Sequence, residues 1–392
     1  MMTYFILMIS MFLTSSCQDQ VRTDEDLKVE PGAYNVNAYF PEIKDKRVGL
    51  VVNHTSMINE THLVDTLLSL GADIKLIFSP EHGFKGTAYN GEKVNDSDYD
   101  GILIKSLYGK TKKPSKEDMD RVDVVIFDIQ DVGARFYTYI YTLHYVMEAA
   151  AESDKKVIIL DRPNPNAHYV DGPIMEPEHT SFVGLHPTPV VYGMTIGEYG
   201  KMINGEGWME NSVSCDLEVI PVANYTHDTE YILPHPPSPN LPNQLSIYLY
   251  PSLCFFEGTV ISAGRGTDQQ FQIYGHPDMT GTYSFTPVSM TSSKYPKHEN
   301  KPCAGRDLTG MLPSFIRSQK KLDLTYLKDA FDSTVLEDDS FFLKSGFFAK
   351  LAGTSKLREQ IENQLSIEEI RESWKSGLDE FKVVRNKYLL YP

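Results

Sequence analysis

The chain has 392 residues, enough for one large domain or two of ordinary size. It carries 37 Lys and Arg against 53 Asp and Glu, which gives a formal net charge of −16 at pH 7. Binding of nucleic acid needs a basic face, so this acidity argues against nucleic acid as a partner. Hydrophobic residues make up 41% of the chain, the content of a globular protein that can bury a core.

The first 16 residues have the pattern of an export signal. The apolar run 4–13 is too short to span a bilayer, and small residues at 14–16 precede Cys17. A cysteine at that place is typical of a bacterial lipoprotein signal. We therefore expect residues 1–16 to be removed, Cys17 to be lipidated and 17–40 to form a tether. The protein would then be exported and held at a periplasmic or outer-membrane surface through the lipid alone.

Three further cysteines follow: Cys215, Cys254 and Cys303. If Cys17 is lipidated, at most one disulfide can form within the chain. No CxxC pair is present, so we expect buried apolar cysteines and no structural zinc site.

Short apolar runs alternate with helical stretches between about residue 47 and residue 166. The runs cover 48–53, 74–79, 102–107, 122–129 and 157–160, and the helical stretches include 61–70 and 137–152. Strands that are apolar along their length indicate a parallel sheet with both faces covered. The sequence therefore predicts an α/β fold with a Rossmann-like parallel sheet in an N-terminal domain, residues 41–200.

The βα alternation is lost after residue 166, where Pro and Gly become frequent. The Pro-rich stretch 234–242 is predicted to be an ordered loop or a rigid connector. Amphipathic helices are predicted over 347–363 and 367–387. We expect a smaller α+β C-terminal domain over residues 201–392.

Four polar residues lie at or just after the carboxyl ends of predicted strands: Asn53, Glu81, Asp128 and Asp161. Ligands bind at that edge of an open parallel sheet. A carboxylate after a strand can instead cap the next helix. Because all four residues fall at the same edge, we expect a binding site there.

Acids, amides, arginines and tyrosines concentrate in five stretches, at 79–86, 127–137, 161–166, 171–178 and 256–267. Paired carboxylates suit cleavage of a glycosidic bond, and arginine and tyrosine suit binding of sugars and carboxylates. A magnesium or calcium site on Asp128 and Asp131 is an alternative.

Several common motifs are missing. The sequence has no G-x-G-x-x-G after the first strand, no P-loop, no H-E-x-x-H and no G-x-S-x-G. We therefore expect no dinucleotide cofactor, and neither the zinc peptidase nor the serine hydrolase signature is present.

In their order along the chain, these motifs resemble those of the exo-β-N-acetylmuramidase family. The matching segments are 53–56, 79–86, 106–109, 127–139, 161–166, 172–178, 192–198, 237–240, 256–267, 347–358 and 385–391. The resemblance implies a glycoside hydrolase that releases N-acetylmuramic acid from the non-reducing end of peptidoglycan fragments such as MurNAc-GlcNAc, for cell-wall recycling. It also implies a Rossmann-like domain, a smaller C-terminal domain and an active site in the cleft between them. Ala167 and Ala263 depart from the expected pattern.

Catalytic roles follow as hypotheses. We expect Glu81 to be the general acid or base, with His82 tuning its pKa, and Glu92 is the rival on the same loop. Glu176 is the expected partner carboxylate. The expected substrate-binding residues are Asn53, Asp128, Asp131, Arg135, Tyr137, Asn164 and Arg265.

Arg135 or Arg265 would bind the lactyl carboxylate of muramic acid, because arginine reads carboxylates with two parallel hydrogen bonds. Two other functions remain as alternative interpretations of the sequence. The protein could be a non-catalytic lipoprotein that binds cell-wall saccharides, or a metal-assisted hydrolase of an ester or amide.

Overall fold

The computed structural model describes residues 28–89, 91–92, 95–109, 111–336 and 340–392. The predicted export signal and Cys17 lie outside the described residues. The predicted tether is too long, because the chain is already folded well before residue 40. A short 3-10 helix, η2 (Gly32–Tyr34), and helix α1 (Val36–Ile43) lie there, and α1 buries Tyr39 and Ile43.

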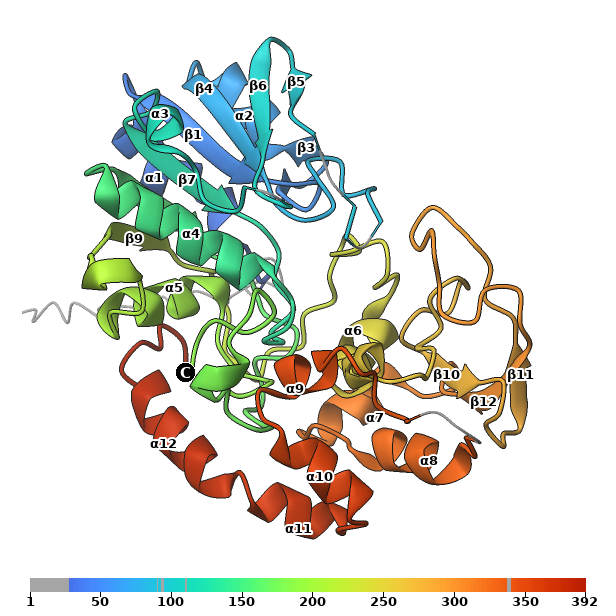
Figure 1. Ribbon diagram of the computed structural model, residues 1–392. Helices are drawn as coiled ribbons and strands as arrows, with labels where there is room; N and C mark the ends of the chain where they lie inside the picture. Colours follow the sequence, from blue (N-terminus) through green and yellow to red (C-terminus); the bar gives the residue numbers. More distant parts are fainter. Residues whose placement is uncertain (1–27, 90, 93–94, 110, 337–339) are drawn as a thin grey trace, which may run out of the picture.

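A seven-stranded sheet forms the centre of the N-terminal half (Figure 1), with strand order β5-β6-β4-β1-β7-β8-β9. Its strands are β1 (Arg47–Val52), β4 (Asp73–Ser79), β5 (Ser97–Tyr99), β6 (Ile102–Ser106), β7 (Val124–Asp128), β8 (Lys156–Leu160) and β9 (Asp216–Ile220). Neighbouring strands are parallel except β5, which runs antiparallel to β6. The predicted Rossmann-like sheet is confirmed.

Helices cover both faces of this sheet, because alternate side chains along each strand point to opposite sides. Leu50 and Ile126 pack with α1 and α2 (Leu63–Ser69). Val51 and Phe127 face the other way and pack with α4 (Tyr139–Glu152) and α5 (Ile196–Gly205), with α3 (Lys116–Met119) at the side. Burial on both faces explains why the strands are apolar along their whole length.

The expected domain boundary at residue 200 falls too early. Strand β9 lies beyond it and pairs in parallel with β8 from Lys156↔Asp216 to Leu160↔Ile220. The sheet therefore takes its last strand from residues that were expected to belong to the C-terminal domain.

The C-terminal half contains a small antiparallel sheet and a series of helices (Figure 1). The sheet has β10 (Ile273–His276), β12 (Cys303–Asp307) and β11 (Tyr283–Phe285) in that order. The helices are α6 (Gln244–Leu253), η5 (Cys254–Gly258), α7 (Pro313–Ser318), α8 (Thr325–Ser333), α9 (Phe347–Ala352), α10 (Lys356–Glu362), α11 (Ile367–Glu372) and α12 (Lys375–Arg385). The remaining short elements are β2 (Met57–Ile58), β3 (Thr61–His62), η3 (Pro177–His179) and η4 (Glu210–Ser212).

Each of the two helices predicted near the C-terminus is divided into two. Gly353 ends α9 in the left-handed conformation, with φ of 79°, which glycine adopts without steric cost. Cys215, Cys254 and Cys303 are buried, as expected, and none of the three forms a disulfide. Among the described residues, none of the helices is both long and apolar enough to cross a membrane.

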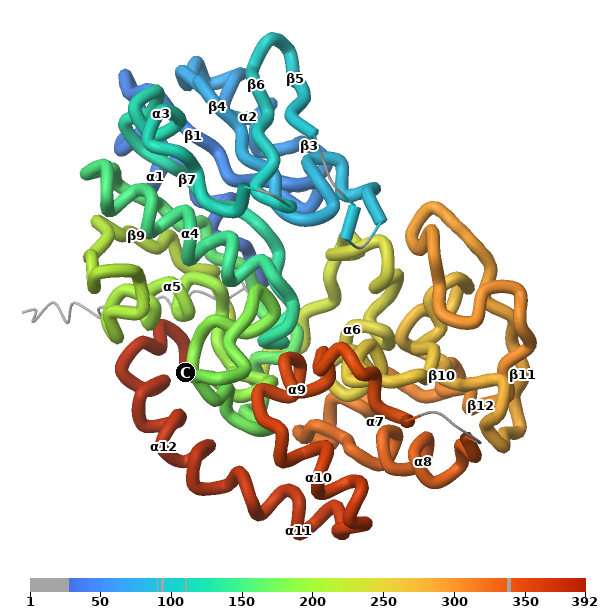
Figure 2. The backbone as a smooth tube through the Cα atoms, in the orientation of Figure 1, coloured from blue at the N-terminus to red at the C-terminus, as the bar shows by residue number. Residues whose placement is uncertain are grey.

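The end of the chain returns to the N-terminal half (Figure 2), where it is held by Asp161 at the end of β8. The fully buried carboxylate of Asp161 accepts hydrogen bonds from the Tyr391 hydroxyl (2.6 Å), the Thr195 hydroxyl (2.7 Å) and the Gly197 amide (2.8 Å). Burial raises the pKa of Asp161 to about 6, although these donors oppose the shift. Asp161 is therefore a structural residue of the strand edge.

Replacing Tyr391 with Phe should destabilise the protein by about 1–3 kcal/mol near neutral pH, because a buried carboxylate loses a donor. The Tyr391 hydroxyl lowers the pKa of Asp161 in the folded protein. Its loss should therefore raise this pKa further above the pKa of Asp161 in the unfolded chain. A carboxyl group whose pKa is raised by folding loses its stabilising contribution as pH rises through the folded pKa. Urea unfolding should therefore show a larger deficit at about pH 8 than at about pH 5. A deficit that is the same at both pH values would contradict this explanation.

Candidate active site

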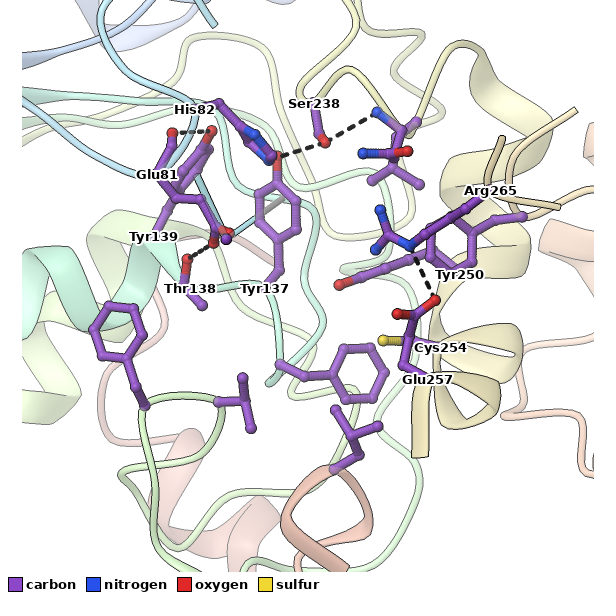
Figure 3. A pocket seen from close by; sticks show the side chains of 18 of the residues that line it. Glu81, His82, Tyr137, Thr138, Tyr139, Ser238, Tyr250, Cys254, Glu257 and Arg265 are labelled. Carbon is purple, nitrogen blue, oxygen red and sulfur yellow. Dashed lines mark hydrogen bonds and ion pairs between the residues drawn. The ribbon is translucent and has the colours of Figure 1, made fainter. Parts of the chain in front are cut away.

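A cavity of about 280 Å³ lies between the two halves of the chain (Figure 3). The N-terminal half contributes the segment after β4 and the residues that lead into α4. The C-terminal half contributes α6, η5 and α9. The principal residues that line the cavity are Glu81, His82, Tyr108, Phe136, Tyr137, Thr138, Tyr139, Phe182, Ser238, Asn240, Tyr250, Cys254, Glu257, Arg265, Phe271 and Leu351.

Glu81 lies in the wall formed by the N-terminal half. The residue is 8% exposed, and its Oε2 accepts a hydrogen bond from the Thr138 hydroxyl at 2.8 Å. None of the ion pairs within the described residues involves Glu81. The side-chain hydrogen bond that orients Glu81 therefore comes from a neutral hydroxyl group.

His82 adopts the left-handed conformation, with φ of 68°. Its Nδ1 lies 2.7 Å from the Ala88 carbonyl and its Nε2 lies 3.2 Å from the Ser238 hydroxyl. Burial lowers the pKa of His82, although the nearby Glu81 opposes the shift. A neutral ring would donate from Nδ1 and accept at Nε2, so His82 connects the loop after β4 to the Pro-rich stretch 234–242. Tuning of Glu81 by His82 stays a prediction.

Glu257 and Arg265 lie in the opposite wall, which belongs to the C-terminal half (Figure 3). Glu257 Oε1 is 2.9 Å from Arg265 Nε. Burial opposes ionisation of Glu257, but Arg265 and Lys297 outweigh it and hold its pKa below the usual value. The Arg265 guanidinium also lies over the ring of Phe271, 5.0 Å from the ring centre.

Two buried polar atoms on residues that line the cavity have no hydrogen-bond partner among the described residues. They are Nη1 of Arg265 and Oδ1 of Asn240. An unpaired buried donor or acceptor is costly, so such atoms are suited to contact a ligand.

Tyrosine rings form the wall between the two carboxylates. Tyr137 packs edge-on against Tyr139, with ring centres 4.8 Å apart, and against Tyr250 at 6.0 Å. The Tyr137 hydroxyl donates to the Pro237 carbonyl at 2.7 Å. Asn53 is behind this wall and donates from Nδ2 to the Tyr139 hydroxyl at 3.2 Å. Tyr137 is therefore in the cavity as predicted, whereas Asn53 supports it from behind.

The carboxylates after β7 do not line the cavity, contrary to expectation. Asp128 forms a buried ion pair with Arg162, at 2.8 Å from Oδ2 to Nη2. Asp131 accepts hydrogen bonds from the Tyr192 hydroxyl and the Gly133 amide, and burial raises its pKa to about 6. Because each carboxylate is already bound to separate partners, the alternative of a shared metal site on the two is not supported.

Asn164 is also outside the cavity. Its Nδ2 donates to the Met194 carbonyl at 2.8 Å, and its Oδ1 accepts from the Asn166 amide at 2.8 Å. The side chain fills the space beside Gly133, where a Cβ would lie 2.3 Å from Asn164 Oδ1. Asn164 therefore packs the strand edge.

The structure does not bring Glu176 or Glu92 to the cavity. Glu176 pairs with Lys356 at 2.8 Å on a different surface, beside α10. Glu92 accepts from the Tyr89 amide at 3.0 Å within its own loop. Sequence reasoning gave no role to Glu257, although it lies eight residues before Arg265 in the same polar stretch. The presence of Glu257 and Arg265 in one polar stretch was the signal in the sequence that could have identified Glu257 as a site residue.

Arg135 is fully buried and binds backbone carbonyls, so its predicted role with a substrate carboxylate is wrong. Its guanidinium donates to the carbonyls of Pro173 (2.9 Å), Thr188, Leu351 (2.9 Å) and Ala352 (2.7 Å). Burial lowers its pKa to about 10. Arg135 thus joins segments that are far apart in the sequence.

A cavity with two carboxylates and a wall of tyrosines is typical of a glycoside hydrolase. The chain belongs to the exo-β-N-acetylmuramidase NamZ family, whose N-terminal domain matches residues 48–245 and whose C-terminal domain matches residues 248–391.

Individual relatives agree with this assignment. The chain is 38% identical over 380 residues to the peptidoglycan β-N-acetylmuramidase NamZ of Bacillus subtilis (strain 168). This match covers 90% of this chain and 89% of the relative. Two crystal structures of DUF1343 family proteins from Bacteroides fragilis NCTC 9343 are also similar. One has a TM-score of 0.85 and 48% identity, over 93% of this chain and 99% of its own. The other has a TM-score of 0.75 and 27% identity, and the match covers 93% of this chain and 100% of that structure's chain.

Replacing Arg135 with Met should lower the free energy of unfolding by at least about 3 kcal/mol, because four buried carbonyls lose their donors. Arg135→Lys should recover only part of this loss, since a single ammonium group cannot reproduce the planar fork of donors. Urea unfolding measures both effects. A variant with wild-type stability but a raised KM would instead support direct binding of substrate by Arg135.

Proposed function

We propose that this protein is an exo-acting β-N-acetylmuramidase that hydrolyses the glycosidic bond of terminal, non-reducing N-acetylmuramic acid in peptidoglycan fragments such as MurNAc-GlcNAc. The observation that carries the proposal is a pair of differently held carboxylates in one cavity. Glu81 is bonded by a neutral hydroxyl, and Glu257 is paired with a guanidinium. Membership of the NamZ family supports the choice of sugar.

Glu81 acts as the general acid in this proposal. Cleavage of a glycosidic bond requires a proton on the departing oxygen, because an unprotonated sugar alkoxide leaves poorly. Thr138 donates to one carboxyl oxygen of Glu81 and orients the group. The other oxygen can carry the proton toward the scissile bond.

Glu257 is the second carboxylate of the mechanism and takes the place expected for Glu176. Arg265 and Lys297 favour its ionised form. A carboxylate held in that form stabilises the positive charge that develops at the anomeric centre, and it can attack that centre or activate water. The two carboxylates come from opposite walls of the cavity, so the sugar would bind between them.

Tyr137, Tyr139 and Tyr250 would pack against the apolar face of the sugar ring. Arg265 would bind the lactyl carboxylate of muramic acid through the part of its guanidinium that lines the cavity. Arg265 would thus select muramic acid over sugars without a carboxylate while holding Glu257 ionised.

An enzyme that acts on peptidoglycan works at the cell wall. In our proposal the protein is exported, cleaved before Cys17 and anchored through a lipid on that cysteine, at a periplasmic or outer-membrane surface. The sequence pattern of residues 4–17 supports this location.

Glu81→Gln and Glu257→Gln should each lower kcat by about 100-fold or more, because each removes a group that acts in the transition state. Glu176→Gln is the matched control and should retain near-wild-type turnover, since Glu176 lies on another surface. The assay is release of N-acetylmuramic acid from MurNAc-GlcNAc by protein that lacks residues 1–17.

Circular dichroism should confirm that all three variants fold. Near-normal turnover of Glu81→Gln or Glu257→Gln would remove that residue from the mechanism. Loss of wild-type turnover in EDTA would favour the metal-assisted hydrolase. Saturable binding of the disaccharide without any release would favour the saccharide-binding lipoprotein.

Cys17→Ser should abolish lipid attachment. We expect the wild-type protein in the membrane fraction of the producing bacterium and the variant outside that fraction, because the fatty acyl chains supply the membrane affinity. Immunoblotting of separated fractions measures this. Membrane association that survives the substitution would contradict the anchor.

A further inference from the structure

The loop that carries the proposed general acid, residues 80–88, is a compact unit, here named the acid loop. The Gly86 amide donates to the Gly83 carbonyl at 3.1 Å. The Ala88 amide donates to the His82 carbonyl at 3.3 Å, and Nδ1 of the His82 ring lies 2.7 Å from the Ala88 carbonyl. Because these bonds link the parts of the loop to one another, a contact made at Gly86 also fixes the position of the acid.

His54 makes such a contact. It follows β1 at the carboxyl edge of the central sheet, and its ring lies against the acid loop at Gly86. A Cβ at residue 86 would lie 1.9 Å from His54 Nδ1, so only glycine leaves room for the ring. Gly86 also has φ of 65°, which glycine adopts without steric cost. His54 therefore touches the backbone of the loop directly.

The other ring nitrogen of His54 holds the Pro-rich stretch 234–242. His54 Nε2 lies 2.8 Å from the Pro236 carbonyl, directly before the Pro237 carbonyl that Tyr137 binds. The same stretch meets the acid loop itself through the contact between the Ser238 hydroxyl and the ring that follows the acid (Figure 3). The His54 ring thus lies between the acid loop and the stretch that faces it.

These contacts require a neutral His54 ring. A neutral ring that donates from Nε2 to the Pro236 carbonyl has a lone pair at Nδ1. That atom is buried and has no hydrogen-bond partner among the described residues, so a proton there would be a buried donor without an acceptor. Burial lowers the pKa of His54, and the nearby His82, His235 and His62 lower it further, although the Pro236 carbonyl opposes the shift.

We propose that His54 is a positioning residue for Glu81, a role that rests on the function proposed above. Its neutral ring holds the acid loop against the Pro-rich stretch and thereby keeps Glu81 beside Thr138 in the cavity wall. Protonation of Nδ1 disrupts this contact, and Glu81 leaves the place from which it reaches the scissile bond. Acid then lowers turnover through His54, separately from ionisation of the carboxylates in the cavity.

His54→Gln tests the proposal, because the glutamine amide can donate to the Pro236 carbonyl but does not titrate. Wild-type His54 takes up its proton only below pH 6.5, its ordinary pKa, since folding lowers that value. Wild-type turnover should therefore fall on the acid side for a reason that the variant lacks. The ratio of variant to wild-type kcat on MurNAc-GlcNAc should rise at least about threefold between about pH 7.5 and about pH 5.

His179→Gln is the matched control, since His179 lies 4.0 Å from Glu176 on a surface outside the cavity. Its ratio to wild type should stay constant with pH. His54→Ala removes the contact altogether and should lower kcat about tenfold at pH 7.5 while KM changes less than about twofold, because a displaced acid impairs the chemical step more than binding.

A double-mutant cycle tests the contact itself. Gly86→Ala should lower kcat more than about tenfold in the wild-type protein, because the added methyl group meets the His54 ring. In the His54→Ala background the same substitution should cost less than about threefold, since the ring is gone. The positive φ of residue 86 is common to both backgrounds, so its effect cancels.

A constant ratio of His54→Gln to wild type across the pH range, or equal effects of Gly86→Ala in both backgrounds, would overturn the role of His54 while leaving the muramidase intact. Circular dichroism of each variant at each pH should confirm that the comparison is made on folded protein. Wild-type protein that releases no N-acetylmuramic acid at any pH would refute the proposed function itself, and the role of His54 would fall with it.

Discussion

The buried guanidinium of Arg135 joins the two halves of the protein directly beside the cavity. It precedes the residues 136–139 that line the N-terminal wall, and it donates to the carbonyls of Leu351 and Ala352 at the end of α9. Gly353 makes this contact possible, because a Cβ at that position would lie 2.6 Å from Arg135 Nη2. A cavity built from both halves can hold a defined shape only if such a connection is rigid.

The site also depends on the different surroundings of two identical side chains. Glu81 is bonded by a hydroxyl, whereas Glu257 lies between Arg265 and Lys297. A pair of carboxylates with the same surroundings would have no means of dividing the tasks of acid and base. Each half of the chain contributes one carboxylate together with its partners, so the two environments are kept apart until folding brings them to one cavity.

The central sheet could be predicted from the sequence because its signal is local. Apolar runs bounded by helical stretches specify buried parallel strands, and the structure has strands at each of the five predicted places. The errors also have local causes. The helix over 347–363 was predicted without allowance for Gly353, and β9 was assigned to the second domain because it follows a region without βα alternation.

The sequence by itself determined the parallel sheet, the family and the concentration of acids, arginines and tyrosines in a few stretches. Only the tertiary structure decided which of these side chains face the cavity. Asp128 and Asp131 resemble site residues in their position after a strand, yet Arg162 and Tyr192 bind them from elsewhere in the chain. The physical reason is that a buried polar group must find a partner, and that partner is chosen by contacts between distant segments, which no local pattern records.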